Sequence, residues 1–197
     1  METELKNVQL IREEPEETLS VQPRKFLLWL FIVSITMMFA AFTSAYLVRK
    51  AEGNWLEFDL PRIFWYSTGV LLLSSLSMGL AHRAAKKDDF ARLRILISTT
   101  FVLGIVFLVM QVMGWGQLVD MNVYLVGNPA GSFVYVLSLV HGVHIIVGLV
   151  VLLVALVAAF KMNIHAKNTN TIETAAMFWH FLDVLWVYLF VFLLYNN

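Results

Sequence analysis

The chain has 197 residues, of which 59% are hydrophobic and 14% are charged, and its formal net charge is zero. Soluble domains carry about 25% charged residues, so this composition excludes an ordinary soluble domain and predicts a single polytopic membrane domain. Zero net charge excludes recruitment of nucleic acid by a bulk electrostatic field. The chain has no cysteine, so any redox cofactor would need histidine or methionine ligands.

The N-terminal residues 1–25 are polar and contain an acidic run at 13–17, which predicts a polar cytoplasmic tail. Residues 26–197 contain apolar segments long enough to cross a hydrocarbon core, which requires about 20 helical residues. These segments are continuously apolar rather than alternating, which favours helices over barrel strands. The sequence therefore predicts an all-α bundle of five transmembrane helices at about 26–48, 64–81, 95–119, 133–160 and 174–195.

Lysine and arginine are unevenly distributed between the two ends of these segments. Cytoplasmic loops of membrane proteins carry the excess of these residues, so their distribution predicts the N-terminus inside and the C-terminus outside. The predicted inner side carries Lys6, Arg12, Arg24, Lys25, Arg83, Lys86, Lys87, Arg92, Arg94, Lys161 and Lys167, and the outer side carries Arg49, Lys50 and Arg62.

Polar residues within the last two segments carry the strongest functional signal. A charged side chain at this depth costs roughly 2.5–3.5 kcal/mol on insertion scales, so each needs a partner or a function. The segments run antiparallel and share a short connection, which predicts a hydrogen-bond network between two helical stripes. One stripe comprises His141, His144 and Gly148, and the other comprises Glu173, His180 and Asp183.

Other segments carry weaker packing signals. Gln111 in the third segment is predicted to bond another helix, and Gly148 is predicted to let another backbone approach closely. Small residues form one face of the second segment, which predicts close packing within this chain or against another subunit. That face comprises Ser67, Thr68, Ser74, Ser75, Ser77 and Gly79.

The histidine and carboxylate pattern alone leaves three interpretations open. Spacing favours hydrogen bonding between helices, a proton relay is the second interpretation, and ligation of a metal or haem is the third. In the haem interpretation, His144 and His180 lie at similar depth on neighbouring helices and act as the two axial ligands.

Two motifs in the last two segments are specific in combination: HGVHIIVG at residues 141–148 and WHFLDVLW at residues 179–186. Together with Glu173 before two alanines, and with residues 67–82 and 103–111, they resemble subunit III of the haem–copper respiratory oxidases in a short five-helix form. The chain lacks two helices of larger members, which form one wall of a phospholipid-holding cleft. Ile35 and Gly114 stand where many members carry acidic residues.

The resemblance implies a non-catalytic subunit III of a terminal cytochrome c oxidase in the cell inner (plasma) membrane. Such a subunit supports assembly, stability and proton uptake of the catalytic subunit. Haem and copper are then expected in a large catalytic subunit and a copper-bearing subunit. This chain is expected to bind neither haem nor copper, and to bind phospholipid. The equivalent subunit of a quinol oxidase or nitric-oxide-reductase-like complex, and a b-type haem cytochrome, remain alternatives.

The residues and the resemblance together predict structural roles for individual side chains. His141, His144, Glu173, His180, Asp183 and Gln111 are expected to form an intramembrane polar network. Gly148, Ser75 and Gly79 are expected at helix-packing contacts. No catalytic or metal-binding residue is expected in this chain, which by itself would catalyse no reaction.

Overall fold

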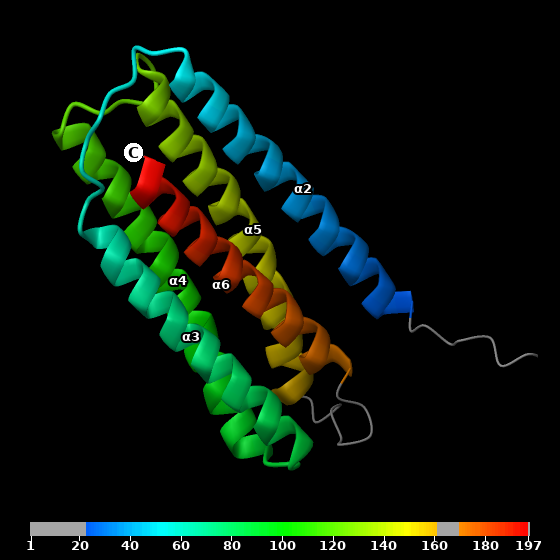
Figure 1. The fold of residues 1–197 in the computed structure, drawn as a ribbon. Helices are drawn as coiled ribbons and strands as arrows, with labels where there is room; N and C mark the ends of the chain where they lie inside the picture. Colours follow the sequence, from blue (N-terminus) through cyan, green and yellow to red (C-terminus); the bar gives the residue numbers. More distant parts are fainter. Residues whose placement is uncertain (1–22, 161–169, 197) are drawn as a thin grey trace, which may run out of the picture.

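The computed structural model describes residues 23–160 and 170–196 (Figure 1). Within these residues the fold is all-α, and five helices are long and apolar enough to cross a membrane, which confirms the predicted fold class. Each predicted segment lies inside one helix, and the helices extend up to five residues further. Their bounds are α2 Pro23–Ala51, α3 Ile63–Lys86, α4 Phe90–Asp120, α5 Pro129–Phe160 and α6 Asn170–Asn196. Most of the predicted tail lies outside the described residues.

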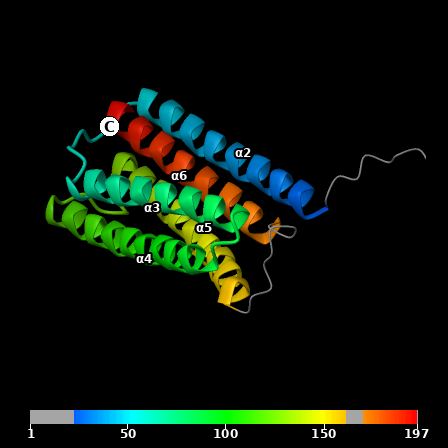
Figure 2. The ribbon, with the colours of Figure 1, turned by 90° about the horizontal axis from the view of Figure 1, so that it is seen from below.

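Four of the helices form a closed ring, and the remaining helix lies against its side. Helix α3 contacts α4 and α6, and α5 also contacts α4 and α6. Helix α2 contacts only α5 and α6 within the described part of the chain. Figures 1 and 2 show α2 on one flank of the bundle and α3 with α4 on the other. The interior of the ring, where α3 to α6 converge, contains some of the polar contacts considered below, such as those of Trp179 and Gln111.

Helix α2 is fixed to α6 at both of its ends. At the beginning of the two helices, Lys25 Nζ donates to Glu173 Oε2 over 2.9 Å. At their far ends, the hydroxyl of Tyr46 donates to the carbonyl oxygen of Asn196 over 2.9 Å, and Lys50 Nζ donates to the same oxygen. Because the beginnings of α2 and α6 lie together and their ends lie together, the two helices run parallel. The first and last of five consecutive spans must cross a membrane in the same direction.

Asn128 organises the connections at the end of the bundle where α2 finishes. Its Oδ1 accepts from the backbone N–H of Ala130 over 2.9 Å at the start of α5, which begins at Pro129. Proline suits this first-turn position because its missing N–H would have had no helical partner. The same side chain accepts from the N–H of Leu56 (3.2 Å) and donates to the carbonyl of Asn54 (3.1 Å). The α2–α3 connection is thereby tied to the start of α5.

A single tryptophan ring occupies the centre of the ring of helices. Trp179 of α6 is fully buried, and two glycines on other helices make room for it. A Cβ placed on Gly104 of α4 would lie 2.7 Å from Trp179 Cη2. A Cβ on Gly148 of α5 would lie 3.1 Å from Trp179 Cζ3 and 2.8 Å from Leu182 Cδ1. The close neighbours of Gly148 are therefore side chains, where the sequence predicts another backbone.

Gly104→Val should destabilise the protein, because the added atoms would overlap the buried side chains of Trp179 and Leu149. Overpacking of this kind costs about 1–3 kcal/mol. Gly116→Val is the matched control on the same helix, since a Cβ there meets nothing within 4 Å. Thermal denaturation of the purified protein in detergent should show a lower Tm for Gly104→Val alone. Equal Tm values for both variants would contradict this packing.

Candidate functional site

The candidate site is a cluster of polar side chains where α6 packs against α3. His180 Nδ1 and Ser75 Oγ share a hydrogen bond of 2.8 Å. Asp183 follows His180 by one helical turn, and its Oδ2 lies 3.9 Å from His180 Nδ1. A Cβ on Gly79 would lie 3.9 Å from His180 Nε2, so this glycine leaves space beside the imidazole. The side chain of His180 is 41% exposed, whereas that of Asp183 is 3% exposed.

Asp183 is the most demanding group in this cluster. The Ser75 hydroxyl lies beside its carboxylate. Neither carboxylate oxygen makes a hydrogen bond of ordinary geometry to any residue that the structure describes. A buried carboxylate without such bonds is costly, and a positive charge or a bound proton reduces the cost. At 3.9 Å the His180 ring supplies that charge when it is protonated, so the two residues can act as one proton-holding pair.

Next to this cluster, hydroxyl groups of α3 accept N–H bonds from two other helices. Trp179 Nε1 donates to Ser74 Oγ over 3.0 Å, and Trp186 Nε1 donates to Thr68 Oγ1 over 3.0 Å. On α4, Gln111 Nε2 donates to Ser67 Oγ over 3.1 Å. The predicted small-residue face therefore packs within this chain. The tryptophan donors were not predicted, although their seven-residue spacing on α6 was a visible signal.

The two histidines of α5 lie apart from this cluster. His144 Nδ1 donates to the carbonyl of Val140 over 2.7 Å, and its ring lies 5.8 Å from the ring of Phe39 on α2. His141 is fully buried, with its ring 5.1 Å from Trp186 and 6.0 Å from Phe107. Neither of its nitrogens has a hydrogen-bond partner among the described residues. Its immediate surroundings are aromatic.

The structure thus distributes the six residues of the predicted network over separate contacts. His180 and Asp183 meet Ser75, Gln111 meets Ser67, and Glu173 meets Lys25 near the helix starts. His141 and His144 face aromatic rings that include Phe39 of α2. The sequence spacing indicated which groups needed partners, and the structure shows that most partners come from other helices.

The two histidines of the haem interpretation have different surroundings. The His144 ring packs against Phe31 and Phe39 of α2, whereas the His180 ring bonds Ser75 of α3. Two axial ligands must face each other across one iron, so this pair does not fit a bis-histidine haem. Among residues 23–160 and 170–196, no three histidine, aspartate or glutamate side chains converge closely enough to hold a metal ion.

Ile35 and Gly114, where the resemblance leads us to expect acidic residues in many family members, take part in apolar packing. Ile35 is buried at 3% exposure. A Cβ on Gly114 would lie 3.0 Å from the ring of Phe64 and 3.1 Å from Ile63 Cγ2. A carboxylate side chain at Gly114 would therefore require the side chains of Phe64 and Ile63 to shift.

The fold and the intramembrane contacts define a polytopic membrane protein whose buried polar groups largely join its own helices. A family model described as cytochrome c oxidase subunit III matches residues 15–197. The chain belongs to this family, the subunit III family of the haem–copper oxidases, and is a subunit III by role. Membership implies association with other oxidase subunits.

Individual relatives cover most of the chain. It is 31% identical over 186 residues to cytochrome bo(3) ubiquinol oxidase subunit 3 of Buchnera aphidicola subsp. Acyrthosiphon pisum, covering 92% of this chain and 90% of the relative. It is 30% identical to cytochrome c oxidase subunit 3 of Bacillus sp. strain PS3, covering 89% and 88%. It is 32% identical to cytochrome c oxidase subunit 3 of Alkalihalophilus pseudofirmus, again covering 89% and 88%.

The bond between Ser75 and His180 should appear as a coupling energy in a double-mutant cycle. Bonds between transmembrane helices couple by about 0.6 kcal/mol on average and up to about 1.7 kcal/mol. Ser75→Ala and His180→Leu should therefore be non-additive in unfolding free energy. Thr99→Val with His180→Leu is the control, because the Thr99 hydroxyl bonds Ile95 of its own helix. Additivity in both cycles would contradict the assigned contact.

Proposed function

We propose that this chain is the non-catalytic subunit III of a terminal cytochrome c oxidase complex in a bacterial plasma membrane. It would bind a large catalytic subunit that carries haem and copper, in a complex with a copper-bearing subunit. Its role would be to support assembly, stability and proton uptake of that catalytic subunit. The observation that carries the proposal is the family match over residues 15–197, together with relatives named as subunit 3 of cytochrome c oxidases.

The polar cluster where α6 packs against α3 supports a specific contact surface for the catalytic subunit. His180 is 41% exposed in the middle of a transmembrane helix, beside a buried carboxylate. Lipid tails offer no hydrogen bonds, so polar groups at this depth normally face protein or a water-filled cavity. Apolar residues close in sequence to Ser75 and His180 are also exposed, including Leu76 of α3 and Val184 of α6. A helix of the catalytic subunit placed here would cover both the polar group and its apolar surroundings.

The support of proton uptake would involve the ends where α3 finishes and α6 begins. His82 and Glu173 are close enough there to interact electrostatically, and Lys25 pairs with Glu173. An imidazole and a carboxylate near the membrane surface can collect protons from solution. With the N-terminus inside, these groups face the cytoplasm.

The orientation follows from the positive charges and has its own test. We expect the N-terminus in the cytoplasm and the C-terminus, at the end of α6, on the outer side. A protease-cleavable tag after Asn197 should be removed in right-side-out vesicles and protected in inside-out vesicles. A tag protected in right-side-out vesicles and cleaved in inside-out vesicles would reverse the orientation and place the His82–Glu173 end outside.

Purification of the complex through this chain tests the proposed function directly. Mass spectrometry of material extracted in mild detergent should identify a large polytopic oxidase subunit and a copper-bearing subunit in near-equal amount. A complex without the copper-bearing subunit that oxidises quinol would support the alternative, with which the 31% identical bo(3) relative is also consistent. The chain eluting alone would refute a subunit role.

In the same preparation, Asp183→Asn should lower the yield of assembled complex while leaving the haem spectrum of the remaining complex unchanged. The amide cannot pair with a protonated His180, and it adds buried N–H groups that need acceptors. Asp120→Asn, at the exposed end of α4, is the matched control and should assemble normally. Full assembly of Asp183→Asn with a shifted haem spectrum would contradict a purely structural role for this carboxylate.

A further inference from the structure

We propose that the groove between α4 and the end of α5 binds one membrane phospholipid, with its anionic phosphate on Arg94 and an acyl chain along α4. The resemblance implies bound phospholipid without placing it, and this inference assigns it a site and depends only on the chain spanning a membrane. The residues that line the groove take no part in the polar cluster of α3 and α6.

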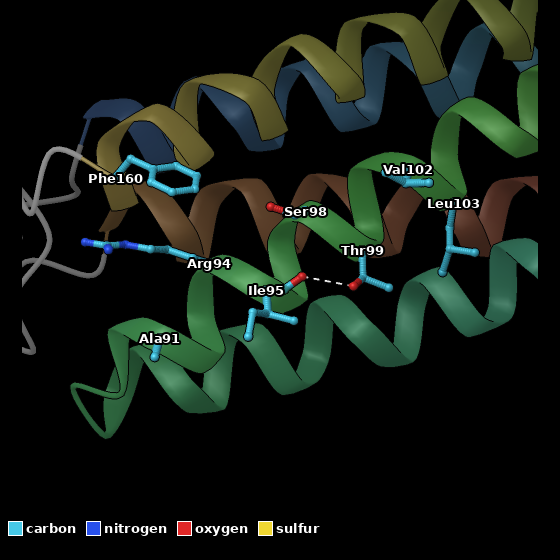
Figure 3. Close-up of a pocket in the computed structure, with 8 residues that line it drawn as sticks. All are labelled: Ala91, Arg94, Ile95, Ser98, Thr99, Val102, Leu103 and Phe160. Carbon is cyan, nitrogen blue, oxygen red and sulfur yellow. Dashed lines mark hydrogen bonds between the residues drawn. The ribbon is translucent and has the colours of Figure 1, made fainter.

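The groove has a volume of about 590 Å³ and opens on the outside of the bundle. Figure 3 shows its walls, with Arg94 and Phe160 together at one end and Val102 with Leu103 at the other. Its lining is mostly apolar, and Ile95 is 66% exposed. The polar Thr99 hydroxyl is occupied, because it donates to the carbonyl of Ile95 over 2.9 Å. The walls therefore suit a hydrocarbon chain.

Arg94 is held at the end of this groove with much of its guanidinium unoccupied. Its Nε donates to the carbonyl of Ala159 over 3.1 Å, and its guanidinium carbon lies 5.2 Å from the centre of the Phe160 ring. These contacts come from the last turn of α5 and leave the terminal nitrogens without a hydrogen bond among the described residues. No described carboxylate pairs with Arg94, whereas Arg92, two residues earlier, pairs with Asp89 at 3.0 Å.

The position of Arg94 along α4 matches the depth of a phosphate group. It lies four residues after the start of the helix, about 6 Å along its axis, where lipid headgroups meet the hydrocarbon core. Val102 lies eight residues further on, or about 12 Å deeper, so the groove can take the first half of an acyl chain. Basic pockets between transmembrane helices near the membrane surface bind anionic headgroups. A partner helix would need a carboxylate at this position, whereas every phospholipid supplies a phosphate.

The first experiment counts bound lipid by native mass spectrometry of the full chain titrated with phosphatidylglycerol. Arg94→Gln should weaken the tightest lipid adduct about tenfold or more, because a charge-assisted hydrogen bond is lost. Arg92→Gln is the matched control, since its guanidinium already has a partner outside the groove. Excess inorganic phosphate should leave the adduct in place, because the acyl chain contributes to binding.

Equal lipid affinity for both arginine variants, or loss of the adduct in phosphate alone, would overturn the proposal. A second pair tests the acyl chain: Val102→Trp fills the groove, and Val109→Trp changes an equally exposed residue outside it. Lipid binding should fall only for Val102→Trp. An equal effect of the two tryptophans would show that no acyl chain lies in the groove.

A photoreactive amino acid at Ile95, introduced in cells that assemble the native complex, tells whether a phospholipid or a partner helix occupies the groove. Crosslinking should add the mass of a phospholipid to this chain. A crosslink to a polypeptide would show that a partner helix covers the groove and would overturn the proposal. That result would leave the oxidase role intact, because the subunit composition of the complex tests that role separately.

Discussion

The rest of the bundle depends on the burial of Trp179 among four helices. Its ring requires the missing side chains of Gly104 and Gly148, and its N–H requires the hydroxyl of Ser74. In hydrocarbon an unpaired N–H has no water to bond. The orientation of the Trp179 ring is therefore set by the Ser74 hydroxyl as well as by the space beside Gly104 and Gly148. Trp179 thereby fixes the distance of helix α6 from α4 and α5, and the rotation of α6 relative to α3.

Helix α3 extends this arrangement by presenting hydroxyls to both of its neighbours. Thr68, Ser74 and Ser75 accept or share bonds with α6, and Ser67 accepts a bond from Gln111 of α4. Thr68 also donates to the carbonyl of Phe64 in its own helix over 2.7 Å, so its hydroxyl has a partner without a second helix. The Ser74 hydroxyl instead donates to the carbonyl of Thr100 on α4 over 3.4 Å. The tryptophan N–H donors of α6 depend on both hydroxyls.

Element identity and length were predictable because membrane thickness imposes a local rule on the sequence, and all five helices follow it. The residues that needed partners were also predictable from the cost of burial. Their partners were not, because a partner depends on how each helix is rotated. His144 and His180 lie at similar predicted depth, yet they face α2 and α3 respectively. Trp179 was missed because tryptophan counts as apolar in hydropathy, although its N–H needs an acceptor.

His180 and Arg94 both reach the outside of the bundle, but they lie at different depths in the membrane. His180 lies ten residues into α6, about 15 Å along the helix, where no headgroup can reach it. Arg94 lies about 6 Å into α4, within reach of a phosphate. On the two proposals above, His180 would face a protein partner and Arg94 a lipid. A subunit that presents both on different helices can bind a larger membrane protein through one face while the other remains in contact with the bilayer.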